Sequence, residues 1–313
     1  MVERLIAERR AAAGRAAPPP GARTAGWAAP PAAGVRRLIV NADDLGLSPA
    51  VNRGIVELHA AGVVTSASLL MNLPATADAL ALTAGSDLDI GVHLNLSTGR
   101  PLARGVGSLV GPDGAFRRPP AQVCRLLAGR LRLDEVEREW AAQIEACLAT
   151  GRRPAHLDSH AHLHALPGLT GVALRLARRY AIGAVRLNGH GLVVRQALPL
   201  LPRRLVGRWR LPPGPAAGAP LLTSDHLLLL TAMGRRVSPD DVAAVLRDLE
   251  PGLTELVIHP GYVDAELRRL DPLTWQRERE LRLLRATWWR PLLAELGLQP
   301  TTFRAELAGA GSR

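Results

Sequence analysis

The stretch LIVNADDLGLSPAVNRG, residues 38–54, places two adjacent carboxylates, Asp43 and Asp44, directly after a run of apolar and β-branched residues. Such a run is typical of a buried strand. Ser48 and Pro49 then supply a helix N-cap and a first-turn proline. The stretch therefore predicts one strand–helix unit with two negative charges at the carboxyl end of its strand.

The same alternation of strand and helix patterns continues along the chain. Further strand-like runs are VVTSASLLM, LDIGVHLNL, GAVRLN and TELVIHPG, whereas LLTSDHLLLL is ambiguous between strand and helix. A long helix rich in Arg and Glu is predicted from about Asp271 to Leu296. At least five strand–helix units in series favour an α/β fold with a closed or nearly closed parallel barrel, although pattern alone does not exclude a doubly wound sheet.

Three segments differ in composition. Residues 1–35 consist mainly of Ala, Pro, Gly and Arg without periodicity, which is typical of a flexible extension. A chain of 313 residues fits one large α/β domain, and we expect it to span residues 36–300. Residues 301–313 are expected to be a C-terminal tail.

The net charge of +11 raises the question of a nucleic-acid or membrane partner. Residues 1–37 alone carry +5 of it, and neither aromatic interleaving nor a recognition motif accompanies the rest. We therefore expect no nucleic-acid role. The chain contains no lysine, which excludes Schiff-base and P-loop chemistry.

Cysteine use and hydropathy bear on the compartment. Cys124 and Cys147 are too few for a disulfide framework or a cysteine zinc site, so a reducing compartment is the simpler interpretation. The N-terminus lacks the apolar core of a signal peptide, and no stretch approaches the roughly 18 apolar residues of a membrane span. These features predict a cytoplasmic protein without a transmembrane segment.

The stretch HLDSHAHLH carries a polar side chain at every second position, namely His156, Asp158, His160, His162 and His164. In an extended strand these side chains all project to one face. Their burial would be costly without a common partner, so a divalent metal or an active-site cavity is the economical explanation. The alternative is that one or two of them, with His162 and His164 favoured, are ordinary loop residues beyond the strand.

Two isolated histidines, His93 in IGVHLNL and His259 in LVIHPGY, occupy comparable places in strand-like runs. A lone histidine in an apolar run is more often a core residue than a ligand. The acidic pair and the histidine cluster change that balance, because all these groups fall at predicted carboxyl ends of strands, where barrel active sites lie. One carboxylate of the Asp43–Asp44 pair can complete a metal site with imidazoles, and the other can accept a proton from an attacking water.

A family resemblance extends this interpretation. Successive motifs resemble those of the YdjC-like (ChbG-type) carbohydrate deacetylases over roughly residues 37–300, in the order VNADDLGLSPAVNRGI, VTSASLLMN, IGVHLNL, PAHLDSHAHLH, AVRLN, TSDHL and ELVIHPGY. The resemblance implies an irregular (β/α) barrel of the YdjC-like and polysaccharide deacetylase type. It also implies metal-dependent removal of the acetyl group from an N-acetylated amino sugar.

The resemblance also implies roles for single residues. Asp43 is similar to the family's catalytic base, and His259 to its general acid or oxyanion partner. The metal ligands implied are Asp44, His93 and His160.

Four further residues receive looser assignments. His162 is the alternative to His160 as a ligand, and Asp158 is expected to orient a ligand. Arg186 and Asp225 are expected to contact sugar hydroxyls, with an ordinary structural hydrogen bond as the alternative for each.

The expected function is therefore a hydrolase with one divalent ion, Zn²⁺ or Mg²⁺, with Mn²⁺ or Co²⁺ as further options. One branch of the family acts on glucosamine-bearing hopanoid lipids, and the sequence does not decide whether the substrate is an oligosaccharide or such a glycolipid. Rival interpretations are another metal-dependent hydrolase, a glycoside hydrolase, and a non-enzymatic sugar- or nucleic-acid-binding protein. The sequence also leaves a homodimer open.

Overall fold

The computed structural model describes residues 34–187, 221–233 and 237–311, so the predicted N-terminal extension lies almost entirely outside the described residues. Seven strands lie within these ranges. They are β1 (Arg36–Leu45), β2 (Ser66–Leu69), β3 (Asp89–Leu94), β4 (Leu157–Ser159), β5 (His226–Leu229), β6 (Gly252–Ile258) and β7 (Leu298–Pro300).

All strand pairs are parallel, and the sheet has the order β4-β3-β2-β1-β6-β5, with β7 paired to the start of β1. Two isolated parallel bridges continue the pairing beyond β4, from Leu157 to Val185 and from Ala184 to Leu222. Leu222 lies just before β5, so these bridges connect the two edges of the curled sheet. The predicted α/β fold with an irregular parallel barrel is confirmed.

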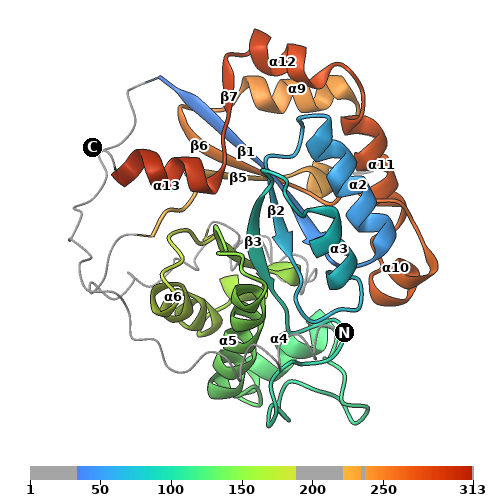
Figure 1. Ribbon diagram of the computed structural model, residues 1–313, viewed down its shortest axis with the longest axis vertical. Coiled ribbons are helices and arrows are strands. Elements are labelled where there is room, and N and C mark those ends of the chain that lie inside the picture. Colours follow the sequence, from blue (N-terminus) through green and yellow to red (C-terminus); the bar gives the residue numbers. More distant parts are fainter. Residues whose placement is uncertain (1–33, 188–220, 234–236, 312–313) are drawn as a thin grey trace.

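Helices connect the strands and surround the sheet (Figure 1). The α-helices are α2 (Pro49–Ala60), α3 (Thr76–Leu82), α4 (Pro119–Leu127), α5 (Leu133–Ala149), α6 (Leu169–Arg179), α9 (Pro239–Arg247), α10 (Ala265–Leu270), α11 (Trp275–Leu284), α12 (Trp289–Glu295) and α13 (Phe303–Gly311). Two 3-10 helices, η1 (His160–Ala165) and η2 (Leu230–Met233), follow β4 and β5. Within the described ranges, no helix has the length and apolar character needed to cross a membrane.

Local sequence signals set several helix ends. The Ser48 side chain caps α2 by accepting a hydrogen bond from the Val51 N–H, as predicted, and Pro49 is the first helical residue. Ser238 caps α9 through a capping box with Asp241. These caps fix the angle at which each helix leaves its preceding loop.

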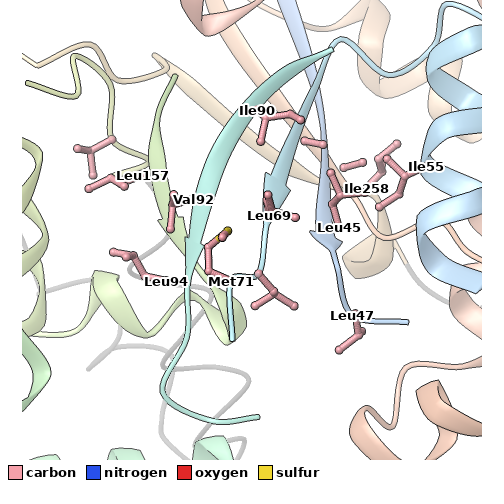
Figure 2. Packing of buried hydrophobic residues seen from close by; sticks show 14 of the residues in the cluster. Leu45, Leu47, Ile55, Leu69, Met71, Ile90, Val92, Leu94, Leu157 and Ile258 are labelled. Atoms are coloured by element: carbon pink, nitrogen blue, oxygen red, sulfur yellow. The ribbon is translucent and has the colours of Figure 1, made fainter. Parts of the chain in front are cut away.

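Successive side chains of a strand point to opposite faces of the sheet, so each strand contributes side chains to two different environments. On β1, Leu38, Val40 and Ala42 belong to the large apolar core that the surrounding helices complete. Figure 2 shows this core with side chains from β1, β2 and β3 together with Ile55 of α2. The intervening residues Asn41 and Asp43 are also buried, but Asn41 bonds to Ser68 of β2 and Asp43 bonds to Arg186.

A smaller apolar cluster lies near the beginnings of the strands. It contains Ile39, Ala155, Ala184, Leu253 and Phe303. The Phe303 ring is fully buried and stacks on the His156 ring at a centroid distance of 4.1 Å. This cluster fills the amino-terminal end of the barrel, opposite the strand ends that carry Asp43 and Asp44.

The structure corrects three elements of the sequence interpretation. The long helix predicted from Asp271 to Leu296 is two helices, α11 and α12, because Pro291 cannot donate the backbone hydrogen bond that a continuous helix requires. The segment expected as a C-terminal tail instead forms α13, which begins at the buried Phe303. A short helix, α4, also lies in the region between the third strand and α5, where no helix was predicted.

Candidate functional site

The predicted site residues meet at the carboxyl ends of adjacent strands. Asp43 and Asp44 lie at the end of β1, His93 near the end of β3, Asp158 in β4, and His259 directly after β6. Because the strands are parallel and neighbours in the sheet, residues that are far apart in sequence share one edge. Of these five residues, only His259 keeps appreciable exposure of its side chain, at 12%.

Asp44, His93 and His160 form a compact cluster of metal-ligand atoms. Asp44 Oδ1 lies 2.7 Å from His160 Nδ1 and 3.3 Å from His93 Nε2. One ligand atom from each of the three residues lies within 4.8 Å of the others. One carboxylate oxygen and two imidazole nitrogens are a donor set that suits a divalent cation, so the residues present fit such an ion.

His93 is held in one orientation by Asp158. His93 Nδ1 lies 2.8 Å from Asp158 Oδ1, which leaves His93 Nε2 facing Asp44. Burial lowers the pKa of His93, but the charges of Asp158 and Asp43 outweigh it and raise the pKa to about 10. A carboxylate behind a histidine is the arrangement that orients ligating histidines in metal sites.

The backbone around Asp44 is unusual for a strand. Asp44 has a φ of +72°, and the pairing register between β1 and β2 is irregular between Ala42 and Leu45. Gly46 follows with a φ of +90°, and a Cβ there would come within 2.8 Å of the Leu70 carbonyl oxygen. The glycine is therefore required, and the two turns in the backbone allow adjacent aspartates to reach different partners.

Arg277 of α11 binds the second oxygen of Asp44. Its Nη2 donates to Asp44 Oδ2 at 2.5 Å and to Asp271 Oδ2 at 2.6 Å, and all three groups are buried. Burial raises the pKa of Asp44, but His160 and Arg277 more than offset this and hold the pKa well below its usual value. Oδ2 is thus occupied, and Oδ1 is the oxygen that faces the two histidines.

Asp43 has a separate arginine. Arg186 donates from Nη1 to Asp43 Oδ2 and from Nη2 to Asp43 Oδ1, both at 2.8 Å, and Asn41 Nδ2 donates to Oδ1. Burial raises the pKa of Asp43, but the charges of Arg186 and His93 together with the hydrogen bonds from Arg186 outweigh it, so the net pKa is lowered. Asp43 Oδ2 also lies 3.8 Å from His259 Nε2 and 4.0 Å from His93 Nε2.

The Arg186 side chain is fully buried and also contacts Asp158 and Glu255. Three carboxylates surround this one guanidinium, so the cluster carries an excess of negative charge. The pKa of Glu255 reflects this excess. Burial raises the pKa of Glu255 to about 7, against the opposing influence of Arg186. Arg186 therefore holds the base of the site together, and its guanidinium has no exposed surface for a sugar hydroxyl.

The histidine-rich stretch differs from the predicted continuous strand. The strand ends at Ser159, and residues 160–165 form η1, in which Ala161 and His162 have φ values of +54° and +53°. The prediction of one continuous strand over the whole histidine-rich stretch is therefore wrong. His164 turns to Ser159 Oγ and the Arg186 carbonyl, which fits the alternative of a structural role.

His162 is buried but lies outside the cluster of ligand atoms. Burial and the charge of Arg186 lower its pKa to about 3, so its ring is neutral at physiological pH. Its Nδ1 has no hydrogen-bond partner among the described residues. His160 rather than His162 thus supplies the nitrogen near Asp44.

Asp225 is not brought to the other predicted residues. It precedes β5 instead of following it, and its Oδ2 accepts a hydrogen bond from the Leu253 N–H near the start of β6. The amino ends of parallel strands lie at the opposite edge of the sheet from the carboxyl ends. Its placement therefore supports the structural alternative considered for this residue.

Comparison with known proteins decides the family. Residues 37–295 match the family described as YdjC-like protein. The chain belongs to the YdjC-like family. This match spans every residue of the site described above.

Several relatives of this YdjC-like chain carry the name carbohydrate deacetylase. The human protein is 35% identical over 287 residues, which cover 84% of this chain and 88% of the relative. The Geobacillus stearothermophilus protein is 36% identical, with coverage of 86% and 97%. A solved structure from Enterococcus faecalis V583, described in terms of cellobiose-phosphate cleavage, superposes with a TM-score of 0.71 at 30% identity and covers 87% of this chain and 99% of that one.

Glu255 and Arg277 of this YdjC-like site escaped the sequence interpretation, as did Thr231 and Glu280, which bond to His259. The sequence does contain a signal for Glu255, because a charged residue inside the apolar run GLTELVI of β6 indicates a functional or paired group. Arg277 and Glu280 lie in the stretch QRERELR, where charged residues are so frequent that none stands out. Their roles depend on which face of α11 is turned inward.

Proposed function

We propose that this chain is a metal-dependent hydrolase that removes the acetyl group from an N-acetylated amino sugar and releases acetate. The convergence of Asp44, His93 and His160 beside Asp43 and His259 carries the proposal. The relatives named carbohydrate deacetylase support it, because they match most of this chain. An amide hydrolase needs a base, an acid and a polarising group near one point, and these residues supply the first two.

The metal would be held by Asp44 Oδ1, His93 Nε2 and His160 Nδ1, the atoms that face one another. A bound divalent ion supplies a Lewis acid for the acetyl carbonyl and favours ionisation of water. The mixed oxygen and nitrogen donors suit Zn²⁺ well and also accommodate Mg²⁺, Mn²⁺ or Co²⁺. Asp158 keeps His93 in place from behind, and Arg277 does the same for Asp44.

Asp43 is the proposed base. Its lowered pKa keeps the carboxylate ionised near neutral pH, so it can accept the proton that the attacking water loses. The paired hydrogen bonds from Arg186 fix the plane of the carboxylate. Asp43 therefore acts from a rigid position beside the ligand cluster.

His259 is the proposed acid. Its Nε2 lies 3.8 Å from Asp43 Oδ2, close enough for the two groups to act on the same reacting group. A proton held at Nε2 passes to the departing nitrogen as the C–N bond breaks, so the products are acetate and a free amine. The unpartnered Nδ1 of His162 is a further group that we assign to a contact with the substrate.

Acetate release tests the proposal. We would incubate chelated and metal-restored protein with N-acetylglucosamine, chitobiose and a lipid-linked N-acetylglucosaminide, and measure acetate, new reducing ends and bound metal. Metal-dependent acetate without reducing ends is expected, and the best substrate separates an oligosaccharide from a glycolipid. New reducing ends without acetate would instead indicate a glycoside hydrolase.

One variant and a matched control test whether His93 is a metal ligand. His93→Ala should lose bound metal together with activity, because His93 Nε2 is one of the three clustered ligand atoms. His59→Ala is the matched control, because His59 pairs with the exposed Asp87 outside the site. Loss of activity in His93→Ala with a full complement of metal would exclude His93 as a ligand.

A further inference from the structure

The His259 ring is connected to a buried carboxylate that the proposed reaction does not use. His259 Nδ1 lies 3.0 Å from Thr231 Oγ1, and Thr231 Oγ1 lies 2.6 Å from Glu280 Oε1. The other oxygen, Glu280 Oε2, accepts the backbone N–H of His259 at 2.6 Å. Glu280 thus holds both the backbone and, through a hydroxyl, the side chain of one histidine.

The direction of these hydrogen bonds determines where the proton of the imidazole lies. A carboxylate only accepts hydrogen bonds, whereas a hydroxyl has a single hydrogen to donate. Thr231 donates that hydrogen to Glu280 Oε1, so its oxygen can only accept from His259. Nδ1 of His259 must therefore carry a hydrogen, and the neutral ring has no hydrogen on Nε2.

We propose that Thr231 and Glu280 are positioning residues that hold His259 in the Nδ1–H tautomer, with Nε2 directed to Asp43. The catalytic meaning of this arrangement rests on the proposed function, but the tautomer itself does not. In this tautomer Nε2 can take up a proton and return it on the side of Asp43. The Nδ1–H bond to Thr231 is the same in the neutral and charged ring, so the ring stays in place while Nε2 gains or loses its proton.

The elements that carry the two residues make the arrangement rigid. Thr231 lies in η2, directly after β5, and Glu280 lies on the inward face of α11. Arg277 is three residues before Glu280, so both side chains lie on the same side of the helix. One helix face therefore braces His259 through Glu280 and Asp44 through Arg277.

Nitrogen NMR tests the tautomer directly, since the ¹⁵N shifts of a neutral imidazole distinguish the protonated from the unprotonated nitrogen. The full chain, loaded with Zn²⁺ and labelled in its histidines, would be compared with His259→Gln to assign the His259 signals. The expected wild-type spectrum shows Nδ1 protonated and Nε2 unprotonated in the neutral ring. A wild-type Nε2–H tautomer would overturn the inference.

Variants then connect the tautomer to turnover. Thr231→Val keeps the shape but removes the hydroxyl, so we expect His259 to shift to the Nε2–H tautomer and kcat to fall about 10- to 100-fold, the range for loss of an orienting outer partner. Bound metal should be unchanged in Thr231→Val. Thr231→Ser, which keeps the hydroxyl, should show the wild-type tautomer and the wild-type kcat. Thr170→Val is the matched control, because the Thr170 hydroxyl bonds only to the Leu166 carbonyl within α6.

Two results would count against the inference. An unchanged His259 tautomer in Thr231→Val would show that the hydroxyl does not set it, and unchanged kcat with an altered tautomer would remove its catalytic meaning. If wild-type protein releases no acetate from any substrate, the proposed function fails, while the wild-type ¹⁵N spectrum still decides the tautomer.

Discussion

At the scale of single residues, the adjacent aspartates are neutralised separately. The sequence alone offered a metal as the partner of one carboxylate and an attacking water as the partner of the other. The structure provides two buried arginines as well, with Arg186 on Asp43 and Arg277 on Asp44. Each arginine lowers the pKa of its own carboxyl group, so both aspartates are ionised without a bound cation.

Replacing Asp43 by Asn should separate the two aspartates by function. The amide cannot accept the proton of the attacking water, so kcat for acetate release should fall about 10²- to 10⁴-fold while bound metal is retained. The measurement is steady-state acetate release together with metal content. Asp225→Asn is the matched control, since Asp225 lies at the other edge of the sheet, and it should leave kcat unchanged. Normal turnover in Asp43→Asn would remove Asp43 as the base.

At the scale of elements, α11 contributes to the site although it lies in the last fifth of the chain. Arg277 reaches Asp44 across 233 residues of sequence, and Glu280 reaches His259 across 21. The local sequence pattern predicts neither contact, because charged residues are spread along α11 and do not mark one face of the helix. Only the packing of the helix against the barrel selects which of its charged residues are buried.

Arg277→Met should destabilise the fold strongly. The change leaves the buried carboxylates of Asp44 and Asp271 without their shared cation, which typically costs about 3–5 kcal/mol. Urea unfolding of the metal-free variant measures the loss. Arg282→Met on the same helix is the control, because the Arg282 side chain is 71% exposed, and its change should stay within about 0.5 kcal/mol. Equal losses in the two variants would contradict the buried role of Arg277.

Helix α13 closes the amino end of the barrel through one aromatic ring. Phe303→Ala should lower the free energy of unfolding by about 3–5 kcal/mol, because it empties a fully buried site against His156. Leu127→Ala, which truncates a side chain that is 60% exposed, should change it by about 0.5 kcal/mol or less. Chemical denaturation measures both. A small loss for Phe303→Ala would mean that α13 contributes little to the barrel.

At the scale of the whole molecule, the barrel buries several neutral histidines that must be charged in the unfolded chain in acid. Burial lowers the pKa of His164 from 6.5 to about 4. Between these values the unfolded chain binds the proton and the folded chain does not, so this residue's contribution to stability is lost as the pH falls through that window. His156 acts in the same direction, with a pKa also lowered to about 4 by burial.

His164→Gln tests this pH dependence. The amide keeps a donor for the Arg186 carbonyl but cannot titrate. As the pH falls from 7 to 4, the free energy of unfolding of the wild type should decrease by about 3 kcal/mol relative to the variant. Between pH 7.5 and 9 the difference should be constant, which serves as the internal control. A constant difference down to pH 4 would show that His164 is not buried as a neutral ring.

The sequence by itself determined the repeating strand–helix order, the cap at Ser48, and the placement of Asp43, His93 and His259 at strand ends. These features depend on neighbours a few residues away, and parallel strands bring their carboxyl ends together in any such fold. Tertiary structure alone decided that His160 rather than His162 faces Asp44, and that Asp225 lies at the far edge. It also decided the contacts of Arg277 and Glu280, because they depend on a turn after β4 and on the inward face of a distant helix, which local pattern does not encode.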